Sequence, residues 1–140
     1  MKDKILIIGG GGFIGMNLAK FLIQNRECEV TLADCSFERD ELEYFSVQQL
    51  SNINFIKDDF SSSPAFDELD KDFDFVYMLA SVVGVNNTLE HPDEVIRVNT
   101  SLIFNCLEWL KTTTVKRVLF TSTSETYSGT TEVLDYPIPT

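Results

Sequence analysis

Four consecutive glycines, Gly9 to Gly12, follow directly on an apolar run, and this stretch constrains the fold more than any other. Residues 5–8 are branched and apolar without polar alternation, which is typical of a central parallel strand covered on both faces. Residues 13–24 have the apolar spacing of a helix. We therefore predict a buried strand, a tight glycine turn and a helix whose first N–H groups face an anion.

Two glycine patterns overlap in this turn. Gly10-x-Gly12-x-x-Gly15 is the dinucleotide fingerprint, whereas Gly9-x-x-Gly12-x-x-Gly15 is the spacing of short-chain dehydrogenases and reductases. The glycines alone leave both patterns open. They also leave open a flavin domain with the same fingerprint, which the absorbance of oxidised flavin at about 450 nm would reveal.

Asp34 strengthens the dinucleotide interpretation. It closes the next predicted strand, residues 28–34, and lies 19 positions after Gly15. A carboxylate there accepts hydrogen bonds from the adenosine ribose, while an ordinary strand-end aspartate is the alternative. The Asp34 carboxylate would also repel the 2′-phosphate of NADP. The next residues, Cys35-Ser36-Phe37, include no guanidinium that could neutralise this phosphate, and Arg39 is the only nearby base. The sequence predicts NAD rather than NADP.

Composition narrows the partners. The 140 residues carry a formal charge of −11, and the longest basic cluster is the pair Lys116-Arg117, so we expect neither nucleic acid nor a membrane as a partner. Three cysteines without a C-x-x-C spacing favour a reducing compartment, and a single histidine, His91, argues against a metal site. The first strand begins too early to leave room for a signal peptide. We expect a soluble, cytoplasmic protein.

Strands and helices alternate along the chain, which predicts an α/β fold. We expect a doubly wound, Rossmann-type parallel sheet of five strands in the order 3-2-1-4-5, with helices on both faces. The predicted strands are residues 5–8, 28–34, 53–57, 74–79 and 117–122. The predicted helices are residues 13–24, 38–50, 64–70 and 92–111. Residues 1–124 would form an NAD-binding domain, and residues 125–140 a loop leading to a further, missing C-terminal part.

The residues that follow the predicted strands resemble the N-terminal half of the extended short-chain dehydrogenase/reductase family. This family comprises nucleotide-sugar epimerases, dehydratases and decarboxylases. The stretches 9–15 and 117–127 are the most specific parts of the resemblance, which covers essentially the whole chain.

The resemblance implies a set of cofactor contacts. Phe13 and Ile14 would present backbone to the diphosphate beside Gly9, Gly12 and Gly15. Asp59 and Phe60 would flank the adenine, and Leu79, Ala80 and Ser81 would line the nicotinamide side, although Leu79 and Ala80 have an equally good structural explanation. Asn99, in the long apolar helix, would reach the cofactor or brace a loop, since a polar side chain there needs a partner.

The resemblance also implies a reaction that begins with oxidation of a sugar hydroxyl. In the family, a tyrosine of a Tyr-x-x-x-Lys motif takes the proton and a Ser or Thr binds the reacting oxygen, a position that Thr123 matches. None of the four tyrosines here is followed by lysine at that spacing. We therefore expect the chain, as given, to be a cofactor domain without activity.

The finer class is less determined. Thr123-Ser124-Glu125 is similar to the corresponding segment of UDP-glucuronate decarboxylases and some epimerases. By this resemblance Glu125 is a hypothetical acid that handles the substrate. The dehydratases have an aspartic acid where this chain has Ser124, and a serine lacks the acidic proton that dehydration requires. The substrate would be a nucleotide sugar. The alternative is a stand-alone, non-catalytic NAD-binding or sensor module, which a natural stop codon after Thr140 would favour. The wide apolar face of residues 92–111 allows either a homodimer or a fully buried helix.

Overall fold

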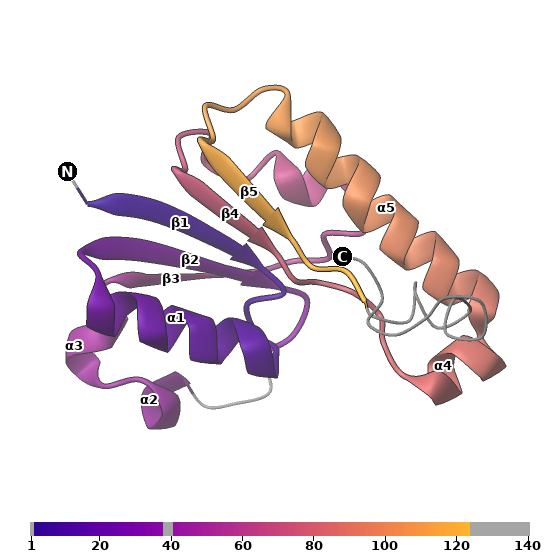
Figure 1. Cartoon of the computed structure of the whole chain (residues 1–140), viewed down its shortest axis with the longest axis horizontal. Coiled ribbons are helices and arrows are strands. Elements are labelled where there is room, and N and C mark those ends of the chain that lie inside the picture. The colour runs from indigo at the N-terminus through magenta and orange to yellow at the C-terminus, as the bar shows by residue number, and fades with distance from the viewer. Residues whose placement is uncertain (1, 38–40, 124–140) are drawn as a thin grey trace, which may run out of the picture.

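One parallel sheet of five strands forms the centre of the molecule, in a computed structural model that describes residues 2–37 and 41–123 (Figure 1). The strand order is β3-β2-β1-β4-β5. The strands are β1 (Asp3–Ile8), β2 (Cys28–Asp34), β3 (Ile53–Lys57), β4 (Phe75–Met78) and β5 (Arg117–Phe120). The predicted fold class and strand order are confirmed. Residues 125–140, the predicted loop, lie outside the described residues.

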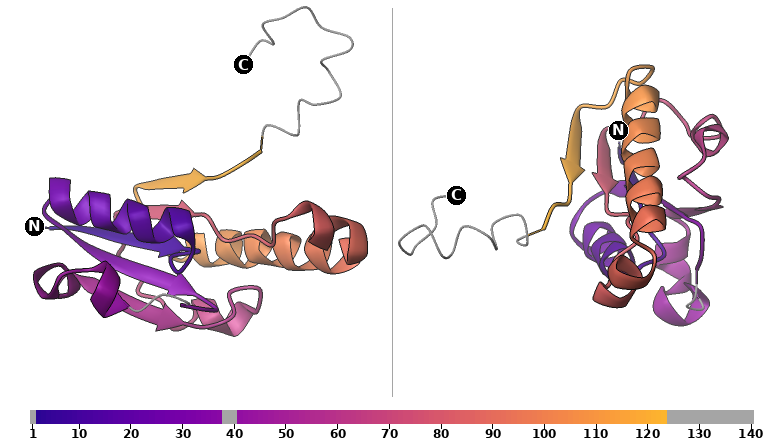
Figure 2. Two further views of the ribbon diagram at one scale, coloured as in Figure 1. Left: turned by 90° about the horizontal axis from the view of Figure 1, so that it is seen from below. Right: turned by 90° about the vertical axis from the view of Figure 1, so that its right-hand side faces the viewer.

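Helices cover both faces of the sheet. On one face lie α1 (Phe13–Asn25), α2 (Glu41–Tyr44) and α3 (Val47–Leu50); on the other lie the short 3₁₀ helix η1 (Ser63–Phe66) and α5 (Pro92–Leu110). Figures 1 and 2 show α4 (Val85–Glu90) against the first turns of α5, away from the strands. The two faces therefore pack two separate apolar layers.

The apolar run of β1 supplies both layers. Ile5 and Ile7 point to the α1 side, where they pack with Met16, and Leu6 and Ile8 point to the α5 side, where they pack with Trp109. These four side chains of β1 are fully buried. Burial on both faces explains why this strand shows no polar alternation.

Two predicted helices need correction, and the sequence did not indicate a further short one. A single helix over 38–50 is wrong, because α2 ends at Tyr44 and α3 begins at Val47. Ser46 caps α3: its hydroxyl accepts the Gln49 N–H at 3.3 Å, and the Gln49 side chain accepts the Ser46 N–H at 2.9 Å. The predicted helix 64–70 is a 3₁₀ turn ending at Phe66, and α4 was not predicted.

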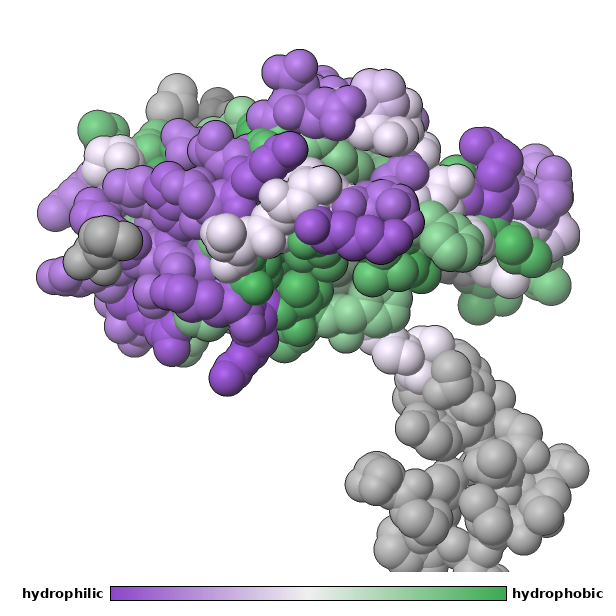
Figure 3. All heavy atoms as spheres, turned by 90° about the horizontal axis from the view of Figure 1, so that it is seen from above, coloured by the Kyte–Doolittle hydropathy of each residue, from purple (hydrophilic) through white to green (hydrophobic). Residues whose placement is uncertain are grey.

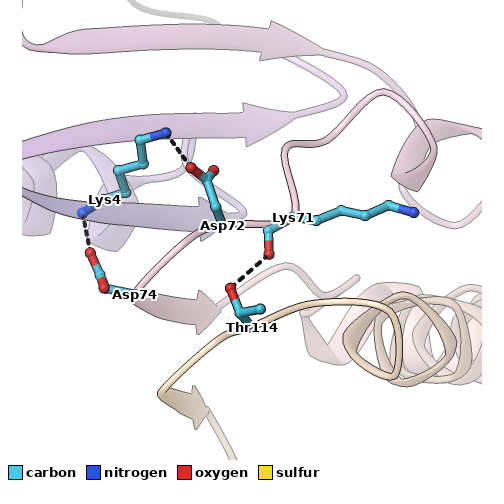
Figure 4. A network of polar contacts seen from close by, with 5 residues as sticks. All are labelled: Lys4, Lys71, Asp72, Asp74 and Thr114. Carbon is cyan, nitrogen blue, oxygen red and sulfur yellow. Dashed lines mark hydrogen bonds and ion pairs between the residues drawn. The ribbon is translucent and has the colours of Figure 1, made fainter.

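Polar contacts join the segments before β4 and β5 to β1 at the amino end of the sheet, and Figure 4 shows those that Lys4 makes with Asp72 and Asp74. The Lys4 N–H donates to Asp74 Oδ2 at 2.9 Å, and Lys4 Nζ lies 2.6 Å from Asp72 Oδ2. The other Asp74 oxygen lies 2.6 Å from Lys116 Nζ. The hydrogen bonds from Lys116 and Lys4 lower the pKa of Asp74, while its carboxylate raises the pKa of Lys116. These pairs lie far from the glycine turn and stabilise the pairing of β1, β4 and β5.

The edge strand β5 is exposed over its whole length. Apolar side chains gather near the middle of the surface in Figure 3, and β5 exposes Val118, Leu119 and Phe120 by 41%, 47% and 55%. In the described part of the chain β5 pairs with β4 alone. Such an apolar edge favours cover by another element.

Candidate functional site

The glycine turn is fixed between β2 and β4. Gly9 has a φ of +90°, and a Cβ there would lie 2.5 Å from the backbone nitrogen of Ala80. The N–H groups of Gly9 and Gly10 both donate to the Ala33 carbonyl, at 2.8 and 3.1 Å. A Cβ on Gly15 would collide with the Gly9 carbonyl. Gly9 and Gly15 are therefore required by the packing of strand, turn and helix.

Gly12 differs from these two glycines. Its φ is −74°, and a Cβ there would meet only the Gly9 carbonyl oxygen, at an ordinary 3.5 Å. Gly12 is the N-cap of α1, which has neither a side-chain cap nor an acidic residue in its first turn. No carboxylate competes at the start of α1, and the positive end of the helix dipole lies there, so this position favours an anion such as a diphosphate.

The Asp34 carboxylate is held by two backbone donors. Oδ2 accepts the Gly11 N–H at 2.9 Å, and Oδ1 accepts the Ser36 N–H at 3.2 Å. A carboxylate has about four acceptor positions, so these bonds orient Asp34 and leave capacity for ribose hydroxyls. The carboxylate is partly buried and borders the cavity described next.

A cavity of about 210 Å³ opens at the carboxyl ends of the strands. It lies at the boundary between the neighbouring strands β1 and β4, where the strand order reverses and doubly wound folds bind their ligands. Eight of the predicted site residues line it: Gly9, Gly12, Asp34, Asp59, Phe60, Leu79, Ala80 and Ser81. The fold therefore brings together residues from four strand ends.

Four of the residues predicted to bind the cofactor do not line this cavity. Phe13 and Ile14 lie in the first turn of α1 with side chains 71% and 64% exposed, so their contribution would come from backbone. Gly15 is buried in the first turn of α1, against the backbone of Gly9 and Gly10. Asn99 braces a loop: its Oδ1 accepts the Val82 N–H at 2.7 Å and its Nδ2 donates to the Val82 carbonyl at 3.0 Å.

Sequence reasoning missed several residues of the cavity wall. These are Ile8, Ala33, Cys35, Ser61, Val82, Val98 and Leu102. Cys35 could have been found from its place next to Asp34, and Val98 from its place before Asn99. Burial, and then the neighbouring Asp34 carboxylate, raise the pKa of the Cys35 thiol. The thiol therefore stays protonated near neutral pH.

The two residues predicted for catalysis are placed differently. Thr123 lies three residues after β5, is exposed and does not line the cavity. Glu125 lies outside the described residues. No group of three or more potential metal ligands occurs within residues 2–37 and 41–123.

With this geometry, comparison with known proteins identifies the family. The family model described as "NAD dependent epimerase/dehydratase family" matches residues 5–139. The chain belongs to this family, and the family description names the cofactor that Asp34 predicted.

Relatives within the family act on nucleotide sugars. The chain is 35% identical over 127 residues to a UDP-N-acetyl-alpha-D-glucosaminuronate decarboxylase of Bacillus cytotoxicus, a match that covers 91% of this chain but 38% of the relative. It is 28% identical over 130 residues to a UDP-glucuronate 4-epimerase of Thermodesulfobacterium geofontis, covering 89% of this chain and 40% of the relative. The chain thus spans less than half the length of these relatives.

A solved structure agrees with the fold. The UDP-N-acetylglucosamine 4-epimerase of Methanobrevibacter ruminantium, in complex with UDP-N-acetylmuramic acid, superposes with a TM-score of 0.79 at 26% identity. The match covers 99% of this chain and 43% of that one. Within the residues described here, no helix has the length and apolar character needed to cross a membrane.

Proposed function

We propose that this chain binds NAD in the cavity at the carboxyl ends of β1 to β4 and is the cofactor part of an enzyme acting on nucleotide sugars. The observation that carries the proposal is that Gly12, the N-cap of α1, and the oriented Asp34 carboxylate line one cavity, with no acidic residue in the first turn of α1. The α1 donors would hold the diphosphate, and Asp34 the adenosine ribose. The family membership and the sugar-modifying relatives support the same assignment.

The proposed chemistry is transient oxidation of a sugar hydroxyl. Bound NAD would supply the hydride acceptor. Among the residues of this chain, Leu79 to Ser81 would shape the nicotinamide side and Thr123 would hydrogen-bond the reacting oxygen. The base of a Tyr-x-x-x-Lys motif is absent from the 140 residues, so we expect the chain alone to bind cofactor without turning over a sugar. The exposed apolar face of β5 favours cover by a further element.

Calorimetric titration tests the cofactor assignment. We expect the chain to bind NAD and to bind NADP at least tenfold more weakly, because the Asp34 carboxylate repels a 2′-phosphate. Equal affinities would contradict the role of Asp34, and no heat with either nucleotide would contradict the site. A yellow preparation that absorbs at about 450 nm would instead indicate a flavin domain.

The alternative is a non-catalytic NAD-binding or sensor module. An activity assay with NAD and a panel of UDP-sugars does not distinguish this module from the cofactor part of an enzyme, because under either interpretation the 140 residues lack the catalytic base. The separating observation is the coding sequence. A reading frame that continues into a Tyr-x-x-x-Lys helix supports the enzyme, and a natural stop codon after Thr140 supports the module.

We further propose that the chain forms a homodimer through α5. Its outer surface exposes Ile96, Phe104 and Leu107 by 67%, 62% and 49%. Cover of this surface by a second copy would remove these side chains from water. Sedimentation velocity should show a dimer that Phe104→Asp converts to a monomer, whereas Val47→Asp, at an 83% exposed position on the opposite side of the sheet, should leave it unchanged.

A further inference from the structure

Helix α5 carries two asparagines that reach opposite walls of the cavity. Asn99 binds the backbone of Val82, beyond β4. Asn105 binds the segment beyond β3: its Nδ2 donates to the Ser61 carbonyl at 2.8 Å and lies 3.5 Å from the Phe60 carbonyl. Val82, Ser61 and Phe60 all line the cavity. One rigid helix therefore connects both walls.

The wall that Asn105 holds lies on the Asp34 side. β2 and β3 are neighbours in the sheet, and the Asp58 N–H donates to the Asp34 carbonyl at 3.0 Å. In a doubly wound fold the acid after the second strand binds the adenosine ribose, with the pyrophosphate at the glycine turn. The segment 59–61 consequently faces the position of the adenosine half.

The rest of this segment bonds mainly within itself. Asp58 Oδ1 accepts the Asp59 N–H at 2.7 Å, and Asp59 Oδ1 accepts the Ser61 N–H at 2.9 Å. These local bonds shape the turn without fixing its distance from the cavity. Phe60 anchors the turn through its buried ring, which packs edge-on against Phe66, and Asn105 anchors the two carbonyls from α5.

We infer that Asn105 is a positioning residue for the adenosine side of the cofactor site. It acts by holding the backbone of Phe60 and Ser61 at the distance from Asp34 that an adenosine needs. This inference rests on the proposed NAD site. It adds a residue that does not line the cavity and that the sequence did not indicate.

AMP separates an effect on the adenosine side from an effect elsewhere in the cofactor site, because AMP is the adenosine monophosphate half of NAD. Asn105→Asp has nearly the same shape but lacks the Nδ2 donor, so the two carbonyls lose their partner. We expect its affinities for AMP and for NAD to fall by the same factor, about tenfold, for the loss of one to two hydrogen bonds. Asn99→Asp, on the opposite wall, should weaken NAD and leave AMP unchanged.

Asn25→Asp is the matched control. Asn25 Nδ2 also donates to a carbonyl at 2.8 Å, that of Phe21, but on exposed α1 surface away from the cavity. The variant makes the same change of charge, so it measures the effect of one extra negative charge on nucleotide binding. Asn105→Gln keeps the amide donor and should retain more AMP affinity than Asn105→Asp.

The outcomes separate the two proposals. If the unmodified chain binds neither AMP nor NAD, the proposed function fails and this inference with it. If the unmodified chain binds both and folded Asn105→Asp binds AMP as tightly as Asn25→Asp, the positioning role alone is wrong. If Asn105→Asp does not fold, Asn105→Gln is measured instead. An equal fall in the affinities for AMP and for NAD supports the positioning role. Full affinity for AMP together with a lower affinity for NAD overturns it.

Discussion

The Asp34 carboxylate accepts the backbone N–H of Gly11 at 2.9 Å, across 23 residues of sequence. This bond joins the end of β2 to the glycine turn after β1. The residue proposed to bind the ribose is thereby oriented by the turn proposed to bind the diphosphate. Ser36 adds a second donor at 3.2 Å, so the carboxylate is fixed before any ligand arrives. Such pre-organisation reduces the entropy that binding costs.

Replacing Asp34 should therefore affect two properties. Asp34→Asn keeps the shape but removes the charge, and we expect NAD affinity to fall about 10- to 100-fold, since hydrogen bonds to a charged acceptor are strong. The preference for NAD over NADP should narrow, because the repulsion of a 2′-phosphate is lost. Asp34→Ala should act in the same direction and also lower the melting temperature, because Gly11 and Ser36 lose their acceptor. Parallel titrations with both nucleotides measure the ratio, and an unchanged ratio would argue against the assignment.

Two glycine variants separate packing from binding. Gly9→Ala should destabilise the fold by about 1–3 kcal/mol, because φ is +90° and the new Cβ would contact Ala80. Gly12→Ala should cost less than about 1 kcal/mol, because alanine is only a poorer N-cap there. It should nevertheless weaken NAD at least tenfold, because the methyl group occupies the diphosphate position. The fluorescence of Trp109, the single tryptophan, reports unfolding. Normal NAD affinity in Gly12→Ala would contradict the proposed diphosphate position.

Bound NAD should protect Cys35 from alkylation. Cys35 is exposed and lines the cavity, whereas Cys28 and Cys106 are buried, and burial raises the pKa of Cys106 to about 11. Because the pKa of Cys35 is also raised, alkylation at pH 7.5 should be slower than for a free thiol and should accelerate as the pH rises. Asp34→Asn should speed alkylation by removing the nearby negative charge. Mass spectrometry with and without NAD measures the rates, and equal rates would place the cofactor away from Cys35.

The polar contacts at the amino end of the sheet should make stability depend on acid. The folded pKa of Asp74 lies below its unfolded value of about 3.9, so its contribution is present above that pH and is lost as the pH falls through the folded pKa. At pH 6, Asp74→Asn should have a lower melting temperature than the unmodified chain. At a pH near the folded pKa of Asp74, the two melting temperatures should be close. Asp67→Asn, at an exposed position, serves as the control. A constant difference between Asp74→Asn and the unmodified chain from pH 6 to pH 2 would contradict this role.

Local patterns in the sequence determined the fold and the glycine turn. The apolar run before Gly9, the helical spacing after it and the acid at position 34 are each readable within a few residues, because strand, turn and helix preferences act over that range. The same reasoning failed at Ser46, where one capping serine divides a predicted helix, and it gave no sign of α4.

Only the tertiary structure decided how the cavity is walled and held. Asn105 and Ser61 are 44 residues apart, and Asn99 and Val82 are 17 apart, so their pairing depends on how α5 packs across the sheet. The tertiary structure also decides which glycines are required by packing. A Cβ at Gly9 would contact Ala80, which follows a different strand. A sequence records which residues prefer a strand or a turn, whereas these contacts arise from the three-dimensional proximity that the packed core imposes.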